Sequence, residues 1–342
     1  MKKIINTLIV LIVGVGVGCS SSTPKIDFKY NGEGKQIDVY VGTEYFTSLI
    51  YSDTIGKPVL YPIVTASGKE ITRGYPLHPR PFERTDHPHH VGLWFSFGDV
   101  NGLDFWNSSF AIEPEDKPRY GSIKFREIVE ADSKTGKLTT KSDWVDFNNA
   151  ILLSEKTTYF FAENDSIRTI ERITELTAQQ QVTFTENKEG LIGMRMDRVF
   201  EEPSDKSKKI LAAQENVTEV PVLNNEEVDG VYRNAEGLIG EKGVWGKRSR
   251  WVALRAEKEG EVITVVILDH PGNSNYPGWS HARGYGLFAH NNLAGRAVDK
   301  DAHPVKLELQ PGEKVVFKHK VVIGGDLADE KINAFSADFA EG

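Results

Sequence analysis

Hydrophobic and polar residues alternate along much of the chain, which is the pattern of strands that bury one face. Runs rich in β-branched and aromatic residues repeat this pattern, and turn-forming glycine, proline and asparagine residues separate many of them. We predict twelve strands from it: Gln36–Val41, Tyr45–Tyr51, Val59–Thr65, Val91–Phe97, Ile123–Ile128, Lys137–Phe147, Ile151–Phe161, Ser166–Leu176, Trp251–Ala256, Glu261–Leu268, Val305–Leu309 and Lys314–Ile323.

Two neighbouring predicted strands, Ile151–Phe161 and Ser166–Leu176, are about twice the usual strand length. Long antiparallel strands of this kind are typical of large sheets that cover each other. Met194–Val199, in which charged and apolar residues alternate, fits one more strand with a wet face. We therefore predict an all-β fold, a large antiparallel β-sandwich.

A short C-terminal helix completes the predicted fold. Asp326 is placed to cap it, and three apolar residues share one of its faces: Ile332, Phe335 and Phe339. The polar, irregular stretch 201–240 is predicted to leave the sheets. Because strands flank it on both sides, we predict a single β-sandwich domain over 26–342.

The first residues resemble a bacterial lipoprotein signal peptide. Two lysines precede an almost wholly apolar run that ends at Gly18, and Cys19 follows it directly. Gly16 stands where such motifs usually carry leucine. We expect residues 1–18 to be removed, Cys19 to be lipidated and 19–25 to form a polar tether. The alternatives are a plain secretory signal or an uncleaved anchor with a chance cysteine.

Composition narrows the class of protein. The chain has 41 Lys and Arg against 49 Asp and Glu, a net charge of −8, and Cys19 is its only cysteine. Loss of 1–18 would make the charge 39 − 49 = −10. An internal disulfide and a cysteine-based zinc cluster are therefore excluded, and the acidic balance gives no general case for nucleic-acid binding. We expect a periplasmic domain held to the membrane by its lipid anchor alone. The sequence does not indicate an oligomeric state.

Seven of the nine histidines lie in two segments, 75–107 and 269–292. Histidine supplies an acid, a base or a metal ligand near neutral pH, tryptophan can stack on sugar rings, and arginine binds hydroxyls and carboxylates. Both segments carry such partners. The candidate residues in them are Arg84, His87, His89, His90, Trp94, Asp104 and Trp106, then His270, His281, Arg283 and Tyr285.

Four blocks of sequence, in this order, resemble the PmoA-like family of bacterial proteins: HPHHVGLWFSFGDVNGLDFW, NKEGLIGMR, VWGKRSRWV and DHPGNSNYPGWSHARGYGLFAHN. The family implies no firm function, and the methane oxygenase in its name is not supported by this sequence. The run Leu309-Gln310-Pro311-Gly312-Glu313, followed by an alternating strand, is similar to the ends of galactose-mutarotase-like supersandwich domains. That resemblance implies sugar binding on a concave sheet face.

We predict a protein that acts on a carbohydrate by epimerisation, hydrolysis or elimination. His90 and His281 are the acid and base candidates and Glu189 the reserve base. Arg84, Arg195 and Arg283 would orient the substrate, Trp94 and Trp106 would stack on it, and the remaining candidates would bind it. One alternative is a non-catalytic carbohydrate-binding protein. Another is a metal site of His87 and His89 with Asp86, Asp104 or His281. No nucleotide-binding pattern occurs, and we expect no cofactor.

Overall fold

The computed structural model describes residues 25–206, 208–211, 217–220, 225 and 227–342. Two eight-stranded sheets dominate it, and every neighbouring pair of strands is antiparallel. The first sheet has the order β1-β2-β3-β4-β5-β11-β18-β17. Its strands are β1 Ile26–Asn31, β2 Gln36–Val41, β3 Glu44–Ile50, β4 Val59–Ile63, β5 Leu93–Phe97, β11 Gly190–Arg195, β17 Trp279–Arg283 and β18 Leu287–Asn291.

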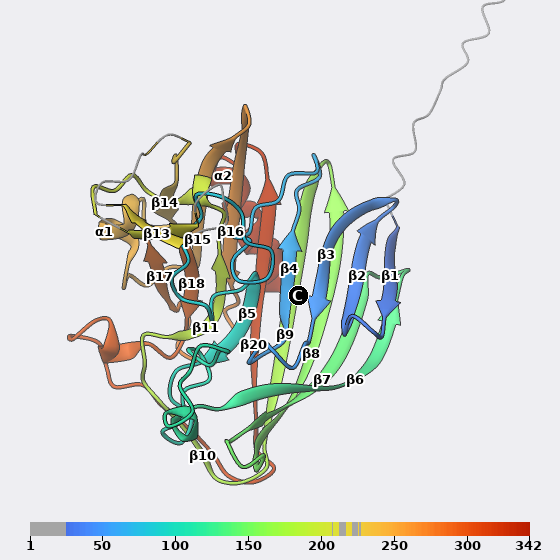
Figure 1. Cartoon of the computed structure of the whole chain (residues 1–342), viewed down its shortest axis with the longest axis vertical. Coiled ribbons are helices and arrows are strands. Elements are labelled where there is room, and N and C mark those ends of the chain that lie inside the picture. Colours follow the sequence, from blue (N-terminus) through green and yellow to red (C-terminus); the bar gives the residue numbers. More distant parts are fainter. Residues whose placement is uncertain (1–24, 207, 212–216, 221–224, 226) are drawn as a thin grey trace, which may run out of the picture.

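The second sheet has the order β14-β15-β16-β20-β9-β8-β7-β6 and lies against the first (Figure 1). Its strands are β6 Ser122–Asp132, β7 Lys137–Val145, β8 Ile151–Asn164, β9 Ile167–Ala178, β14 Val231–Asn234, β15 Trp251–Lys258, β16 Glu261–Asp269 and β20 Lys314–Gly324. All twelve strands of the first prediction overlap observed strands, so the all-β antiparallel sandwich is confirmed.

Smaller elements join the sheets. They are the strand pairs β10 Val182–Thr185 with β19 Lys306–Leu309 and β12 Lys208–Leu211 with β13 Val217–Val220, the helix α1 Gly240–Val244, and 3-10 turns at Lys117–Arg119, Arg198–Phe200 and Gly295–Ala297. The stretch 201–240 does leave the sheets, but it returns to the second one at β14. The strand predicted at Met194–Val199 is wrong in its bounds: β11 ends at Arg195 and a 3-10 turn follows.

The main core lies between the two sheets. Strand β9 alternates buried and half-buried residues along its whole length, as its sequence pattern requires. Aromatic rings meet across the interface, with Phe46 of β3 6.0 Å from Phe161 of β8 and Phe95 of β5 5.9 Å from Phe317 of β20. Residues that point to the opposite face of the first sheet are therefore available to form a site.

The C-terminal helix α2, Asp329–Glu341, packs on the outer face of the second sheet. Ile332 and Phe339 are buried there and Phe335 packs beside them, as predicted. The predicted cap is wrong. Ala328 occupies the cap position without a side-chain hydrogen bond, and Asp326 instead pairs with Arg255 of β15.

A buried polar network interrupts the sandwich interior near β16. The Asp269 carboxylate accepts hydrogen bonds from the side-chain amides of Asn273 and Asn292 and from the backbone N–H of Gly278. Its Oδ2 lies 3.3 Å from His290 Nε2. Burial alone would raise the pKa of Asp269, but these hydrogen bonds and His290 lower it to about 2. The ionised carboxylate thus holds the loop between β16 and β17.

The predicted signal peptide, Cys19 and nearly all of the predicted tether lie outside the described residues. Within the described part of the chain, no helix combines the length and the apolar character needed to cross a membrane.

Candidate functional site

The two histidine-rich segments meet on the outer face of the first sheet, the face turned away from the second sheet. Segment 75–107 supplies β5, segment 269–292 supplies β17 and β18, and β11 lies between them. Backbone pairing places Trp94, Gly193, Ala289 and His281 in one row across these four strands. Side chains in such a row project from the same face.

Gly193 is the position in this row against which two tryptophan rings pack. A Cβ atom there would lie 2.8 Å from both Trp94 and Trp106. The two indole rings occupy the space that any larger side chain would need. They are fully buried and pack against each other with ring centroids 5.0 Å apart. Neither ring offers a face to a solute in this structure, so their part in the site is to support His90, whose ring stacks on Trp94 at 5.2 Å.

A charge cluster with two buried guanidinium groups, those of Arg73 and Arg195, anchors the loop above the sheet. The Oδ1 atom of Asp86 accepts hydrogen bonds from Arg73 at 2.9 Å and from Arg195 at 2.7 Å. Arg73 also donates to the backbone carbonyls of Asp86, His87 and His90. Burial would raise the pKa of Asp86, but Arg195, His87 and Arg73 together hold it far below its ordinary value. The loop that carries the histidines is thereby fixed to β11.

The cluster also determines the tautomer of His90. Arg195 Nη1 lies 3.2 Å from His90 Nδ1, and a guanidinium can only donate, so Nδ1 must accept. Burial, followed by the charges near it, holds the pKa of His90 well below its ordinary value, and the ring is neutral at pH 7. Its proton is therefore on Nε2, and this buried N–H has no protein partner in the described residues.

Aromatic rings continue from His90 towards the surface. The His87 ring stacks on His90 at 4.9 Å and on Tyr285 at 5.0 Å, and His89 meets His90 edge-on at 4.3 Å. Three guanidinium groups surround the Tyr285 ring at 4.8 to 6.0 Å, those of Arg84, Arg195 and Arg283. Arg84, Arg283 and Tyr285 line an open hollow of about 850 Å³. The site thus reaches solvent beside Tyr285.

His281 and Glu189 form a second pair on this face. His281 Nδ1 lies 3.8 Å from Glu189 Oε2, which is longer than a hydrogen bond. Burial, followed by Lys188 and Arg283, lowers the pKa of His281 to about 3. The imidazole is consequently neutral at pH 7 and can accept a proton.

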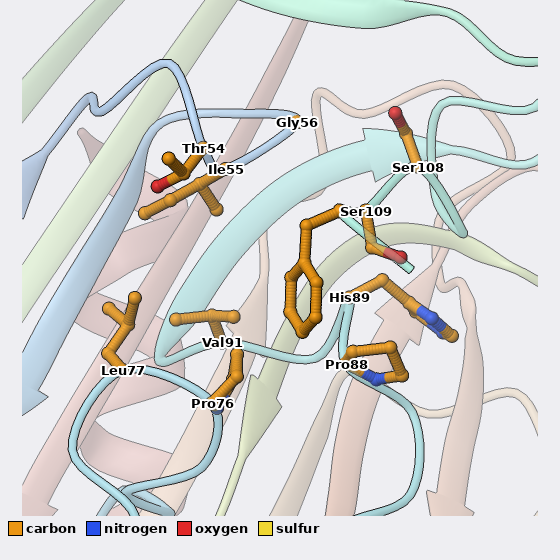
Figure 2. Close-up of a pocket in the computed structure, with 11 residues that line it drawn as sticks. Thr54, Ile55, Gly56, Pro76, Leu77, Pro88, His89, Val91, Ser108 and Ser109 are labelled. Atoms are coloured by element: carbon orange, nitrogen blue, oxygen red, sulfur yellow. The ribbon is translucent and has the colours of Figure 1, made fainter. Parts of the chain in front are cut away.

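His89 opens on a different side of the site, into a pocket of about 160 Å³. Figure 2 shows the side chains of Ile55, Leu77 and Val91 on one side of this pocket and those of His89 and Ser109 on the other. Burial, followed by Lys57, lowers the pKa of His89 to about 2, so His89 is neutral as well.

Two predicted site residues have other roles in the structure. His270 lies on the other side of the molecule, where its ring meets Phe339 of α2 at 5.1 Å. Asp104 accepts hydrogen bonds from the backbone and side-chain N–H groups of Asn107 and closes a turn. We therefore take neither as part of the site. Nor do the described residues contain any group of three His, Cys, Asp or Glu that is arranged to hold a metal ion.

Sequence reasoning did not identify Arg73 or Lys57 as site residues. Lys57 is buried beneath the site and donates to the Trp106 carbonyl at 2.7 Å. Burial, partly opposed by Asp104, lowers its pKa to about 7. Arg73 and Lys57 lie beside strands, in sequence without any motif. Only the pairing of strands far apart in the chain brings them close to the histidines.

Buried polar atoms without a hydrogen-bond partner gather on this face. Trp94, Ser96 and His281 project from it, and His90 and Trp106 pack on it. The unpartnered atoms are Trp94 Nε1, Trp106 Nε1, Ser96 Oγ, His90 Nε2 and His281 Nδ1. Native proteins leave few such groups, so a bound water or ligand is their expected partner.

Residues 36–337 match the model of DUF6807, described as a family of unknown function. No curated protein matches the chain. Among solved structures, it is similar to a GH36 α-galactosidase from Geobacillus stearothermophilus, at 10% identity over 88% of this chain and 41% of that one, with a TM-score of 0.40. The chain spans about two fifths of the α-galactosidase chains it matches.

Two further similar structures are matched over nearly their whole length. One is a galactose mutarotase related enzyme from Lactobacillus acidophilus, at 10% identity over 87% of this chain and 97% of that one, with a TM-score of 0.32. The other is a putative aldose 1-epimerase from Escherichia coli K12, at 9% identity over 88% and 99%, with a TM-score of 0.33.

Proposed function

The chain belongs to DUF6807, a family of unknown function, and we propose that its outer-face site binds a carbohydrate and acts on it by acid–base chemistry. The observation that carries the proposal is the group of buried, unpartnered polar atoms beside a stack of aromatic rings. A sugar presents hydroxyl groups that both donate and accept, together with apolar C–H faces that pack on rings. It therefore satisfies both kinds of surface at once.

In this proposal His90 is a hydrogen-bond donor to the substrate and stays neutral. Its Nδ1 is occupied by Arg195, so only Nε2–H is available to a ligand. A neutral imidazole N–H can donate to an oxygen on which negative charge develops. His90 cannot act as a base through Nε2 while Arg195 stays in place, which narrows the acid-or-base role predicted for it.

His281 is the base, and Glu189 stabilises it. When His281 takes a proton from a sugar hydroxyl or C–H, the imidazolium gains a carboxylate 3.8 Å away. Closing that distance would raise the pKa of His281 from about 3 towards the working pH. Catalytic hydrogen bonds are often long in a free enzyme and shorten when substrate binds.

The arginines orient the substrate. Arg283 is more than a third exposed and pairs with Glu241 at 3.3 Å, while Arg84 pairs with Glu201 at 2.9 Å. Both guanidinium groups reach the open hollow beside Tyr285 and can donate to sugar oxygens.

The location is part of the same proposal. We propose that Cys19 is lipidated and that the domain is held in the periplasm. The basic start, the apolar run and the sole cysteine after it support this. We also propose that the chain is related to PmoA-like proteins. Labelling with a fatty-acid analogue should mark the chain, and C19S should lose the label.

The test joins calorimetry with a panel of sugars to product analysis on the same panel. We expect H281Q to keep sugar binding and to lose turnover at least 100-fold, since general base catalysis contributes about 10²–10⁴-fold. H270Q is the matched control and should keep full turnover, because His270 lies against α2. Sugar binding without turnover in the unmodified protein would favour a non-catalytic binding protein, and turnover unchanged in H281Q would remove His281 from the mechanism.

A further inference from the structure

Three adjoining hollows form one continuous groove that starts at His89. The first is the pocket of about 160 Å³ at His89, which shares Thr54, Ser108 and Phe110 with a second hollow of about 480 Å³. The second shares Asp53 and Lys124 with a third of about 560 Å³. Figure 2 shows Thr54 and Ser108, two of the residues shared with the second hollow, at the first pocket. We call the three together the aromatic groove.

Exposed aromatic rings concentrate in this groove. Among the described residues, four aromatic side chains are more than half exposed, and three of them line it: Tyr30 at 66%, Phe110 at 60% and Phe147 at 53%. The fourth, Phe82 at 53%, lies outside it. The stacked pair Tyr51 and Phe125, with ring centroids 3.8 Å apart, lines the far hollow. Exposed aromatic rings along a concave surface offer faces on which the apolar surface of a ligand can pack.

Polar groups line the same groove. Hydroxyls, an amide and charged groups line its second hollow: Thr54, Ser108, Ser109, Ser122, Lys117, Lys124, Asp146 and Asn149. The core of a protein interface is instead contiguous, apolar and depleted of charge. Flat apolar faces together with donors and acceptors match successive sugar rings, which expose C–H faces and hydroxyl edges.

We propose that the aromatic groove binds a carbohydrate chain of several sugar units, one end of which reaches His89. This deepens the proposed function and rests on it. The second and third hollows each have the volume of a pocket that takes a whole small-molecule ligand, so together they exceed the needs of one sugar. Because the His89 ring contacts His90 at 4.3 Å, the groove ends at the candidate catalytic cluster. The substrate class is therefore a glycan rather than a free monosaccharide.

The experiment is native electrophoresis of the full chain in gels that contain hydroxyethyl cellulose, xylan, galactan or polygalacturonate. At least one gel should retard the unmodified protein. The double variant F110A/F147A should bind that polysaccharide about tenfold more weakly, since each ring contact contributes about 0.5–1.5 kcal/mol. F82A is the matched control, as exposed as Phe147 but outside the groove, and should be retarded like the unmodified protein. An unchanged thermal unfolding midpoint checks that each variant folds.

The outcomes separate the groove from the proposed function. The groove is refuted if no polysaccharide retards the protein, or if F82A weakens retardation as much as F110A/F147A. Small sugars that bind and turn over without any retardation overturn the groove alone. Retardation that F110A/F147A abolishes, with no small sugar or chain turned over, supports the groove and overturns the acid–base function.

Discussion

The carboxylate of Asp86, which pairs with two buried guanidinium groups, should be the most sensitive single position in the site. In D86N, two guanidinium groups with almost no exposure, those of Arg73 and Arg195, lose their shared counter-charge. Breaking a buried pair of this kind costs about 3–5 kcal/mol. For roughly 300 described residues, an unfolding entropy of about 2.1 cal/mol/K per residue gives about 0.6 kcal/mol/K. The expected fall in the thermal unfolding midpoint is therefore about 5–8 °C.

The pH dependence gives an independent check on D86N. The folded pKa of Asp86 is far below the unfolded value of about 3.9, so its stabilisation is fully present above pH 4 and declines as the pH falls. The difference in free energy of unfolding between the unmodified protein and D86N should narrow by about 1.4 kcal/mol per pH unit below about 3.9. Thermal melts or urea titrations from pH 7 to pH 3 measure it.

The control for D86N is D53N. Asp53 is also paired with a cation, Lys35, but both side chains lie in solvent, and such pairs contribute little. D53N should melt with the unmodified protein. A midpoint shift below 1 °C in D86N, or an equal shift in both variants, would refute the role assigned to the Asp86 carboxylate.

Three further predictions address the catalytic pair, the sheet and the interior. E189Q should lower turnover and leave sugar affinity within about twofold. The acid limb of its pH–rate profile should move to lower pH, because the His281 imidazolium loses its carboxylate. An acid limb that does not move would contradict the pairing of His281 with Glu189. G193A should destabilise the fold by about 1–3 kcal/mol through overlap with Trp94 and Trp106, whereas G243A, whose new Cβ would meet only ordinary contacts at 3.6 Å, should not show this loss in chemical denaturation. D269N should unfold at a lower urea concentration than the unmodified protein at pH 7. The difference in stability should shrink as the pH falls below about 4, because the folded pKa of Asp269 is depressed to about 2. A difference in stability that is the same at all pH values would show that the charge of Asp269 does not matter.

Alternation predicted most of the long strands that have one half-exposed face, but the twelve predicted strands omit β11, β17 and β18, in which nearly every residue is buried. Strand β9 alternates along its whole length and was predicted almost to its ends. All residues of β18 are buried, so the sequence of Leu287–Asn291 shows no regular alternation of apolar and polar residues and was not predicted as a strand. The cap at Asp326 failed because the helix begins at Asp329, which puts Ala328 and not Asp326 at the cap position.

The sequence indicated which types of residue would form the candidate site, but not to which face of the sheet each side chain points. The density of histidines singled out two segments that the structure brings to one sheet, yet it gave no means to separate His281 from His270 or His290. In the structure His290 pairs with Ser280, one residue from His281, and therefore points to the opposite side of the sheet, into the network of Asp269. Strand register decides the face, and register depends on pairing between strands far apart in the chain.

The strand order of the first sheet determines how far the candidate site lies from the N-terminal strand β1. β1, where the described chain begins, is one edge of this sheet, and the site occupies the four strands at the other edge (Figure 1). At about 4.8 Å per strand, the site strands lie about 20–35 Å from β1. A domain fastened through its N-terminus would hold its histidines on the side away from the fastening, while the aromatic groove, whose far hollow is lined by Tyr30 of β1, would run from them towards the fastened edge.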